Sequence, residues 1–172
     1  MGGLEIKPST LNTMIEEVRE MYERFVRFPT DGFDASEVPL RYQTDDGLEL
    51  FGTVDAVYRE DLGGHRLVDW KTGELGDVED QLGFYSLLWT LEHEEVPTAV
   101  EAVSVRTGER HHSSPTVQDV TRTAGDVAAM ASEIRTAWAS GAAVKRRAGP
   151  WCRYCPILED CEEGKTVEAM LA

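Results

Sequence analysis

A chain of 172 residues, 41% of them hydrophobic, is long enough to form one domain with a substantial core. Its 32 acidic residues outnumber its 17 basic ones, which gives a formal net charge of −15. The hydrophobic content excludes a disordered acidic chain. No signal peptide and no apolar run near the roughly 20 residues that span a bilayer stand in the sequence, so we expect a cytoplasmic protein.

The basic residues are divided unevenly between lysine and arginine. Four are lysines, and a surface poor in lysine but rich in carboxylates keeps a protein soluble in concentrated salt, so we expect a halophilic source. The acidity argues against a broad basic surface that binds nucleic acid. A local basic cluster is formed by Lys145, Arg146 and Arg147, with Arg153 nearby. Because salt weakens such contacts, affinity for nucleic acid would have to come from a metal site and from groove shape.

The first part of the chain predicts a helix, a loop and a strand. Apolar residues recur every three or four positions from Leu11 to Phe28, which predicts an amphipathic helix that packs on a sheet. Residues 31–36 have the pattern of a loop, and Val38 to Thr44 that of a first strand. Glu37 stands just before this strand. Its carboxylate is either a third ligand near a metal ion or an ordinary surface group.

The segment from Leu50 to Lys71 predicts a β-hairpin with its turn at Glu60 to Gly64. Alternation places Asp55, Asp69 and Lys71 on one side of the strands. The other side takes the apolar residues Leu50, Val54, Ala56, Tyr58, Val68 and Trp70. If the strands pair symmetrically about the turn, Asp55 lies directly opposite Asp69, with Cβ atoms roughly 4.5–5.5 Å apart.

Two opposed carboxylates beside a lysine predict a metal site. Like charges in this position are unfavourable unless a cation neutralises them. Carboxylate oxygens suit a hard divalent ion such as Mg²⁺, which keeps several waters and substrate phosphate oxygens. Lys71 supplies a charge for the phosphate or for the developing hydroxide. The chemistry indicated is metal-assisted hydrolysis of a phosphodiester; the alternative is a pair of acids on a solvated strand face.

A helix is predicted from about Val78 to Glu92, and its apolar residues cover nearly its whole circumference, so we expect it to be buried. Gln81 and Tyr85 lie four residues apart on one face, near the start of the helix and just beyond Lys71. They either border the site or belong to a helix with an ordinary core tyrosine.

The rest of the chain predicts two strands, a helix and a cysteine-bearing tail. Thr98 to Arg106 and Arg110 to Ser113 form a strand pair, and Val117 to Ala139 a long helix. The tail, residues 149–172, contains Cys152, Cys155 and Cys161. Three thiols at this spacing concentrate ligands as metal sites do, although such a site wants four. The alternative is three unrelated buried cysteines.

Taken together, these motifs carry a family likeness. Gly-Thr-Val-Asp55, Asp69-Trp-Lys71-Thr-Gly, Gln81-x3-Tyr85 and the three cysteines follow one another in this order. The order resembles the RecB-type branch of the PD-(D/E)XK nucleases, which includes the CRISPR-associated exonucleases and the AddB-type helicase-nucleases. The likeness runs from about Glu37 to Cys161. It implies an α/β fold, restriction-endonuclease-like, with a central mixed β-sheet flanked by helices, in a single domain 1–172.

The resemblance also implies roles for these residues. Asp55 and Asp69 would bind Mg²⁺ or Mn²⁺, and Lys71 would position or activate the attacking water. Gln81 and Tyr85 would border the site and contact DNA. The cysteines would be three of the four ligands of a [4Fe-4S] cluster that attaches the C-terminal tail to the body: Cys152, Cys155 and Cys161.

Two departures from the family pattern concern the tail and the first helix. The fourth cluster cysteine normally lies upstream, and this sequence has no cysteine before Cys152. The histidine that many relatives carry in that region is absent too, since the first here is His65. The chain is then a shortened member or a fragment, or the site takes another ligand, binds zinc or remains empty.

These inferences lead to a metal-dependent DNA nuclease, exonucleolytic by resemblance. Its partners would be DNA, as single strands or duplex ends, and a protein of DNA repair or of CRISPR-type adaptation. Two alternatives remain open at this point. One is a catalytically silent scaffold that keeps the nuclease fold, and the other is a small adaptor that binds zinc or an iron-sulfur cluster through its cysteines.

Overall fold

The computed structural model describes residues 7–142 and 146–171, which fall into two compact units. The first unit ends at Ala128 and contains the β-sheet, and the second begins at Ala129 and contains the three cysteines. The single domain with a tail from residue 149 stays a prediction. No helix in the described part of the chain combines the length and the apolar character needed to cross a membrane.

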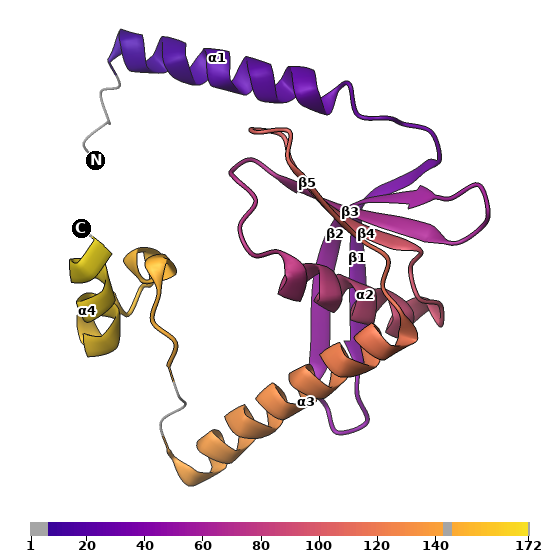
Figure 1. The fold of residues 1–172 in the computed structure, drawn as a ribbon. Coiled ribbons are helices and arrows are strands. Elements are labelled where there is room, and N and C mark those ends of the chain that lie inside the picture. Colours follow the sequence, from indigo (N-terminus) through magenta and orange to yellow (C-terminus); the bar gives the residue numbers. More distant parts are fainter. Residues whose placement is uncertain (1–6, 143–145, 172) are drawn as a thin grey trace. The chain divides into compact units, whose positions relative to one another are not determined.

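Five strands form one mixed sheet in the order β1-β2-β3-β4-β5 (Figure 1). Neighbouring strands are antiparallel except β3 and β4, which run parallel because a helix, α2, connects them. This architecture confirms the predicted α/β fold with a central mixed sheet. The bounds are β1 Phe33–Gln43, β2 Glu49–Arg59, β3 His65–Lys71, α2 Glu79–His93, β4 Ala99–Ser104 and β5 Arg110–Ser113.

Strand β1 begins earlier than predicted. Residues 31–36 were expected to form a loop, but Phe33 pairs with Tyr58 and Ser36 pairs with Ala56. The register shifts between Phe33 and Ala35. Most side chains in this stretch are exposed, and hydrophobic alternation reveals a strand only where one face is buried.

Both faces of the sheet carry an apolar cluster. On one face, strand residues such as Val57 and Leu67 pack with Leu88 and Trp89 of α2. α2 is therefore buried, as its all-round apolar sequence predicts. The other cluster contains Ala56, Tyr58, Val68 and Val103, with Phe28 and Trp70 packed against it.

Even-numbered residues of β2 face one side of the sheet in the first half of the strand and the opposite side in the second half, which is a change of phase in its alternation. Leu50 and Val54 pack in the α2 cluster, whereas Ala56 and Tyr58 belong to the opposite cluster, so the prediction that all four share one side was wrong. The neighbouring strand is irregular at the same level. Glu37 of β1 has φ of 52°, in the left-handed region that non-glycine residues seldom adopt.

Helix α1 (Pro8–Phe25) begins and ends three residues earlier than predicted, with Pro8 in its first turn. Its contacts with the sheet lie near its C-terminal end. The Phe25 ring centroid is 5.0 Å from that of Trp70, and Phe28, just beyond the helix, is 4.5 Å from the same ring. No side chain of α1 is buried.

The second unit is small and helical. It contains the end of α3 (Val117–Ser140), which matches the predicted helix closely. Two 3₁₀ helices follow, η1 (Pro150–Tyr154) and η2 (Leu158–Asp160), and then helix α4 (Glu162–Leu171), which the sequence pattern did not predict.

Candidate active site

The pairing of β2 with β3 has the predicted register. Ala56 pairs with Val68, so Asp55 and Asp69 come next along their strands. The backbone pairing of the two strands ends at this level. Beyond it, a side chain of β2 accepts a hydrogen bond from the backbone of β3: Trp70 N donates to Asp55 Oδ2 at 2.6 Å. The carboxylate of Asp55 is therefore fixed directly against β3.

Asp69 lies at the centre of a polar network in an otherwise apolar part of the protein. Its side chain is 5% exposed, and its Oδ2 atom is 2.7 Å from Lys71 Nζ. Its Oδ1 atom accepts hydrogen bonds from Gln81 Nε2 at 3.1 Å and from the Tyr85 hydroxyl at 3.4 Å. Four of the predicted site residues thus come together from β3 and the start of α2.

Gln81 joins the lysine to the acid. Its Oε1 atom accepts from Lys71 Nζ at 2.7 Å, and its Nε2 atom donates to Asp69 and, at 3.0 Å, to the Tyr85 hydroxyl. This orientation of the amide is consistent, since an ammonium only donates and a carboxylate only accepts. Burial raises the pKa of Tyr85, so its hydroxyl remains a proton donor at neutral pH.

Burial and, after it, two neighbouring acids disfavour the charged form of Asp55. Burial is the largest influence and raises the pKa of this carboxyl, and the charges of Asp69 and Glu37 raise it further. The hydrogen bond from Trp70 N and the charge of Lys71 act in the opposite direction. A cation placed between the carboxylates would remove the repulsion that raises this pKa.

Glu37 is near Asp55 but outside the hydrogen-bonded network. It is exposed, and on β1 it stands between the residues that pair with Val54 and Ala56. Across residues 7–142 and 146–171, no three His, Cys, Asp or Glu side chains are gathered so as to hold a metal ion. The assignment of Glu37 as a third metal ligand therefore stays a prediction.

The donor set fits a divalent ion held by two carboxylates. Within the described residues, Asp69 Oδ2 is a buried oxygen without a hydrogen bond, and its charged neighbour is the Lys71 ammonium. Mg²⁺ is commonly bound by one or two protein carboxylates, with water and substrate phosphate in the remaining positions. Asp55 and Asp69 would hold such an ion and leave those positions open.

The three predicted thiol ligands all lie in the second unit as free thiols, with Cys152 buried and Cys155 and Cys161 partly exposed. The backbone of Gly164 closely approaches two of them. A Cβ atom on Gly164 would lie 3.4 Å from Cys161 Sγ and 3.6 Å from Cys152 Cβ. Thiols suit iron-sulfur clusters and zinc, but the described residues do not bring these three together as a ligand group.

Charged side chains surround Cys161. Arg146 donates to Cys161 Sγ at 3.5 Å and lies 3.5 Å from the Glu163 carboxylate, which also accepts from Cys161 Sγ at 3.6 Å. Arg146, a member of the predicted basic cluster, thus pairs with residues of the second unit. Lys145 lies outside the described residues.

The sequence pattern missed a group of residues at the end of β4. Ser104 and Arg106 hydrogen-bond to backbone carbonyl groups just beyond Lys71. The available signal was a serine near the end of the predicted strand, followed by Val105 and Arg106. Its meaning depends on β4 lying next to β3, which local pattern does not reveal.

With this geometry in view, the comparisons with known proteins identify the family. The model of the PD-(D/E)XK nuclease superfamily matches residues 4–162, and the chain belongs to this superfamily. The predicted resemblance is confirmed at that level, whereas the RecB-type branch and the iron-sulfur cysteines stay predictions.

Solved structures support the same fold. Matches extend to 23 chains. One of them, titled "Crystal structure of SSO0001", has a TM-score of 0.51 and 14% sequence identity, and the alignment covers 92% of this chain and 72% of that chain. At this identity the likeness concerns the fold alone. No curated protein matches the chain significantly.

Proposed function

We propose that the chain is a metal-dependent deoxyribonuclease that hydrolyses phosphodiester bonds at the network between β3 and α2. One observation carries the proposal: Lys71 Nζ lies 2.7 Å from both Asp69 Oδ2 and Gln81 Oε1, with Asp55 on the adjoining strand. A solvated pair of surface acids would not be buried among these partners. Membership of a nuclease superfamily supports the reaction class.

The residues have distinct roles in this proposal. Asp55 and Asp69 bind Mg²⁺ or Mn²⁺, and the bound ion supplies charge that stabilises the reacting phosphate and acidifies water. Lys71 directs its ammonium at the attacking water or at a phosphate oxygen. Gln81 and Tyr85 hold Asp69 and Lys71 in this arrangement and border the path of the DNA.

The finer assignment rests on the order of the sequence motifs. In this assignment, the protein is an exonuclease of the RecB-type branch that acts on single strands or duplex ends. Its biological setting is DNA repair and recombination, or CRISPR-type adaptation with a protein partner. The charge of −15 makes nonspecific attraction to DNA weak, so most of the affinity must come from the metal site and the groove around it.

The test is cleavage of end-labelled single- and double-stranded DNA in high potassium chloride, with Mn²⁺ or with EDTA. Wild type should release label only with Mn²⁺, and Asp69→Ala should release none. Asp46→Ala, in the turn before β2, is the matched acidic control and should cleave as wild type does. Equal cleavage by wild type and Asp69→Ala would reject the assignment of the site.

A silent scaffold is the second candidate, because the net charge of −15 weakens attraction to DNA. Isothermal titration with Mn²⁺ separates the two candidates. Binding by wild type that disappears in Asp55→Ala supports the nuclease, and absence of binding supports the scaffold.

For the tail, we propose that Cys152, Cys155 and Cys161 bind an iron-sulfur cluster or zinc. The spacing of the thiols supports this. Elemental analysis of protein purified without oxygen distinguishes iron with sulfide from zinc. Absence of both metals would reject the proposal and favour three structural cysteines.

A further inference from the structure

Three successive carbonyl groups at the end of β3 are each held by a donor from the end of β4. Val105 N donates to Lys71 O at 2.9 Å. Arg106 Nε donates to Thr72 O at 2.9 Å, and Ser104 Oγ donates to Gly73 O at 2.6 Å. The backbone that carries Lys71 and the two residues after it is therefore fixed to the neighbouring parallel strand.

Ser104 also closes the turn from which these donors come. It is fully buried, and its hydroxyl accepts a hydrogen bond from Thr107 N at 3.0 Å. Its carbonyl accepts from Gly108 N at 2.8 Å, and Gly108 has φ of 80°, which glycine tolerates. The turn between β4 and β5 thus has a defined shape that directs Arg106 at Thr72.

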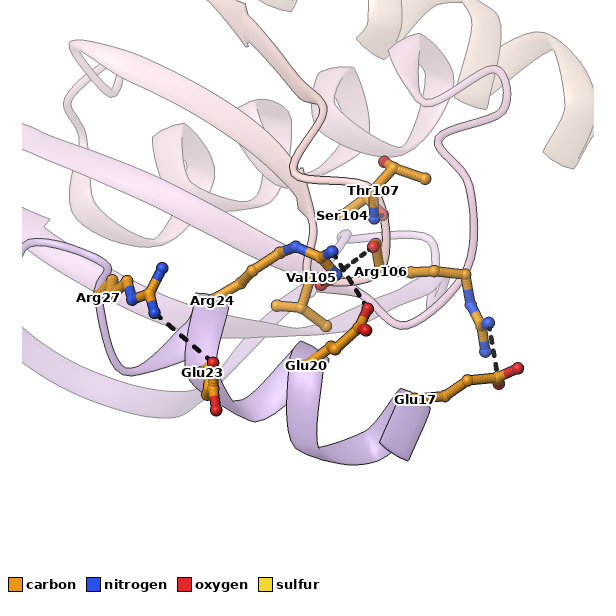
Figure 2. A network of polar contacts seen from close by, with 9 residues as sticks. All are labelled: Glu17, Glu20, Glu23, Arg24, Arg27, Ser104, Val105, Arg106 and Thr107. Atoms are coloured by element: carbon orange, nitrogen blue, oxygen red, sulfur yellow. Dashed lines mark hydrogen bonds and ion pairs between the residues drawn. The ribbon is translucent and has the colours of Figure 1, made fainter. Parts of the chain in front are cut away.

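Helix α1 contacts the same turn (Figure 2). Arg24 donates to Val105 O at 3.1 Å and also to Arg106 O. The Arg106 guanidinium has two partners. Its Nε atom donates to Thr72 O, and its Nη1 atom lies 3.3 Å from Oε2 of Glu17 in α1. One side chain therefore joins α1, the turn after β4 and the segment after Lys71.

The segment after Lys71 needs this support. Thr72, Gly73 and Glu74 are exposed, and no atom lies within 4 Å of the position that a Cβ on Gly73 would take. Little packing therefore restrains this part of the backbone. Lys71 is the last residue of β3, so a displacement of Thr72 would move its ammonium away from Asp69.

We propose that Arg106 is a positioning residue for Lys71, and that α1 supports it through Glu17. Arg106 does not touch the reacting groups. It holds Thr72 O so that Lys71 Nζ stays between Asp69 and Gln81, and the ion pair with Glu17 keeps its guanidinium in place. The inference rests on the proposed function of Lys71, and it makes α1 part of the catalytic apparatus although the helix has no buried side chain.

Two measurements on the full chain test the proposal: steady-state cleavage of labelled DNA with Mn²⁺, and deuterium uptake in a peptide that spans residues 100–109 and contains the Val105 amide, which donates to Lys71 O. Arg106→Ala should lower kcat by about tenfold, since one lost hydrogen bond and a small displacement of a catalytic group have effects of this order. KM for DNA should stay within about twofold, because positioning does not supply uniform binding. Deuterium uptake should become faster.

Matched variants separate positioning from general stability. Arg106→Lys keeps a donor and a positive charge and should recover part of the loss in kcat. Glu17→Gln weakens the contact with Arg106 and should have a smaller effect in the same direction. Arg19→Ala is the control, because Arg19 pairs with Glu16 inside α1 and should change neither measurement.

Unchanged kcat and unchanged uptake in Arg106→Ala would overturn the proposal, as would a change confined to KM. If Arg106→Ala does not fold, Arg106→Lys and Glu17→Gln decide the outcome by the same two measurements. If wild type cleaves no DNA, the proposed function fails. Deuterium uptake still decides whether Arg106 holds this segment.

Discussion

The network at β3 and the cysteine-bearing second unit differ in what holds their side chains in place. In the first, Asp69 is buried, and Lys71 and Gln81 are within hydrogen-bonding distance of their partners. In the second, Cys155 and Cys161 are partly exposed and the three thiols are not gathered in the described residues. The sheet and a buried helix preform the first group, whereas for the tail we propose that the thiols come together only as a metal binds.

The largest expected effect comes from the preformed site. Lys71→Ala should lower kcat by about a thousandfold, because it removes a charge directed at the reacting phosphate. The melting temperature should change little, since Lys71 lies at the end of its strand. Cleavage of labelled DNA with Mn²⁺ measures the effect. Lys165→Ala, a partly exposed lysine paired with Glu162, is the control and should retain full activity.

The second expected effect concerns the tail and tests whether the two sites are independent. Cys152→Ser should lose bound iron or zinc, because it removes one of three thiols. Mn²⁺ binding measured by titration should stay within about twofold of wild type, since Asp55 and Asp69 lie in the other unit. Loss of Mn²⁺ binding in Cys152→Ser would contradict the independence of the two sites, and with it the distinction between a preformed and a metal-dependent site.

Within the preformed network, the tyrosine should matter less than the lysine. Tyr85→Phe removes the hydroxyl that donates to Asp69 at 3.4 Å, a long hydrogen bond, while Gln81 still contacts the acid. We expect kcat to fall by about threefold to tenfold. Tyr58→Phe, buried in the opposite apolar cluster, is the matched control. A loss as large as that of Lys71→Ala would instead indicate that the tyrosine acts directly on substrate.

The smallest expected effect is on stability. Asp55→Asn removes a charge that Asp69 and Glu37 repel, while an amide oxygen can still accept from Trp70 N. Without metal, its melting temperature at neutral pH should exceed that of wild type by about 2 °C. With Mn²⁺ the order should reverse, because wild type gains binding energy that the variant lacks.

The pH dependence of this difference follows from the raised pKa of Asp55. The native state takes up this proton at higher pH than the unfolded state does, so the stability of wild type rises as pH falls through that range. The advantage of Asp55→Asn over wild type should therefore shrink toward pH 4. Calorimetry at several pH values measures it, with Asp45→Asn in the exposed turn as the control. An advantage that is independent of pH would contradict this account.

What could be predicted from the sequence depended on local patterns. The turn at 60–64 and the alternation beside it were sufficient to predict the register of β2 with β3. They could not reveal the phase change in β2, because they assume that alternation continues unbroken along the strand. The role of Arg106 also lay beyond local patterns, since it depends on which strands become neighbours. The cysteine spacing predicts ligands but leaves the metal undetermined.

The parallel pairing of β3 and β4 has a consequence for how such a protein can diversify. Because the two strands run in the same direction, their carboxyl ends reach the same edge of the sheet. The loop that leaves β3 there is exposed at Gly76 and Asp77, with open space around Gly76. Insertions at this point would change the surface beside Lys71, while the side chains on the strands keep their places. The surface around the network and the network itself can therefore vary separately.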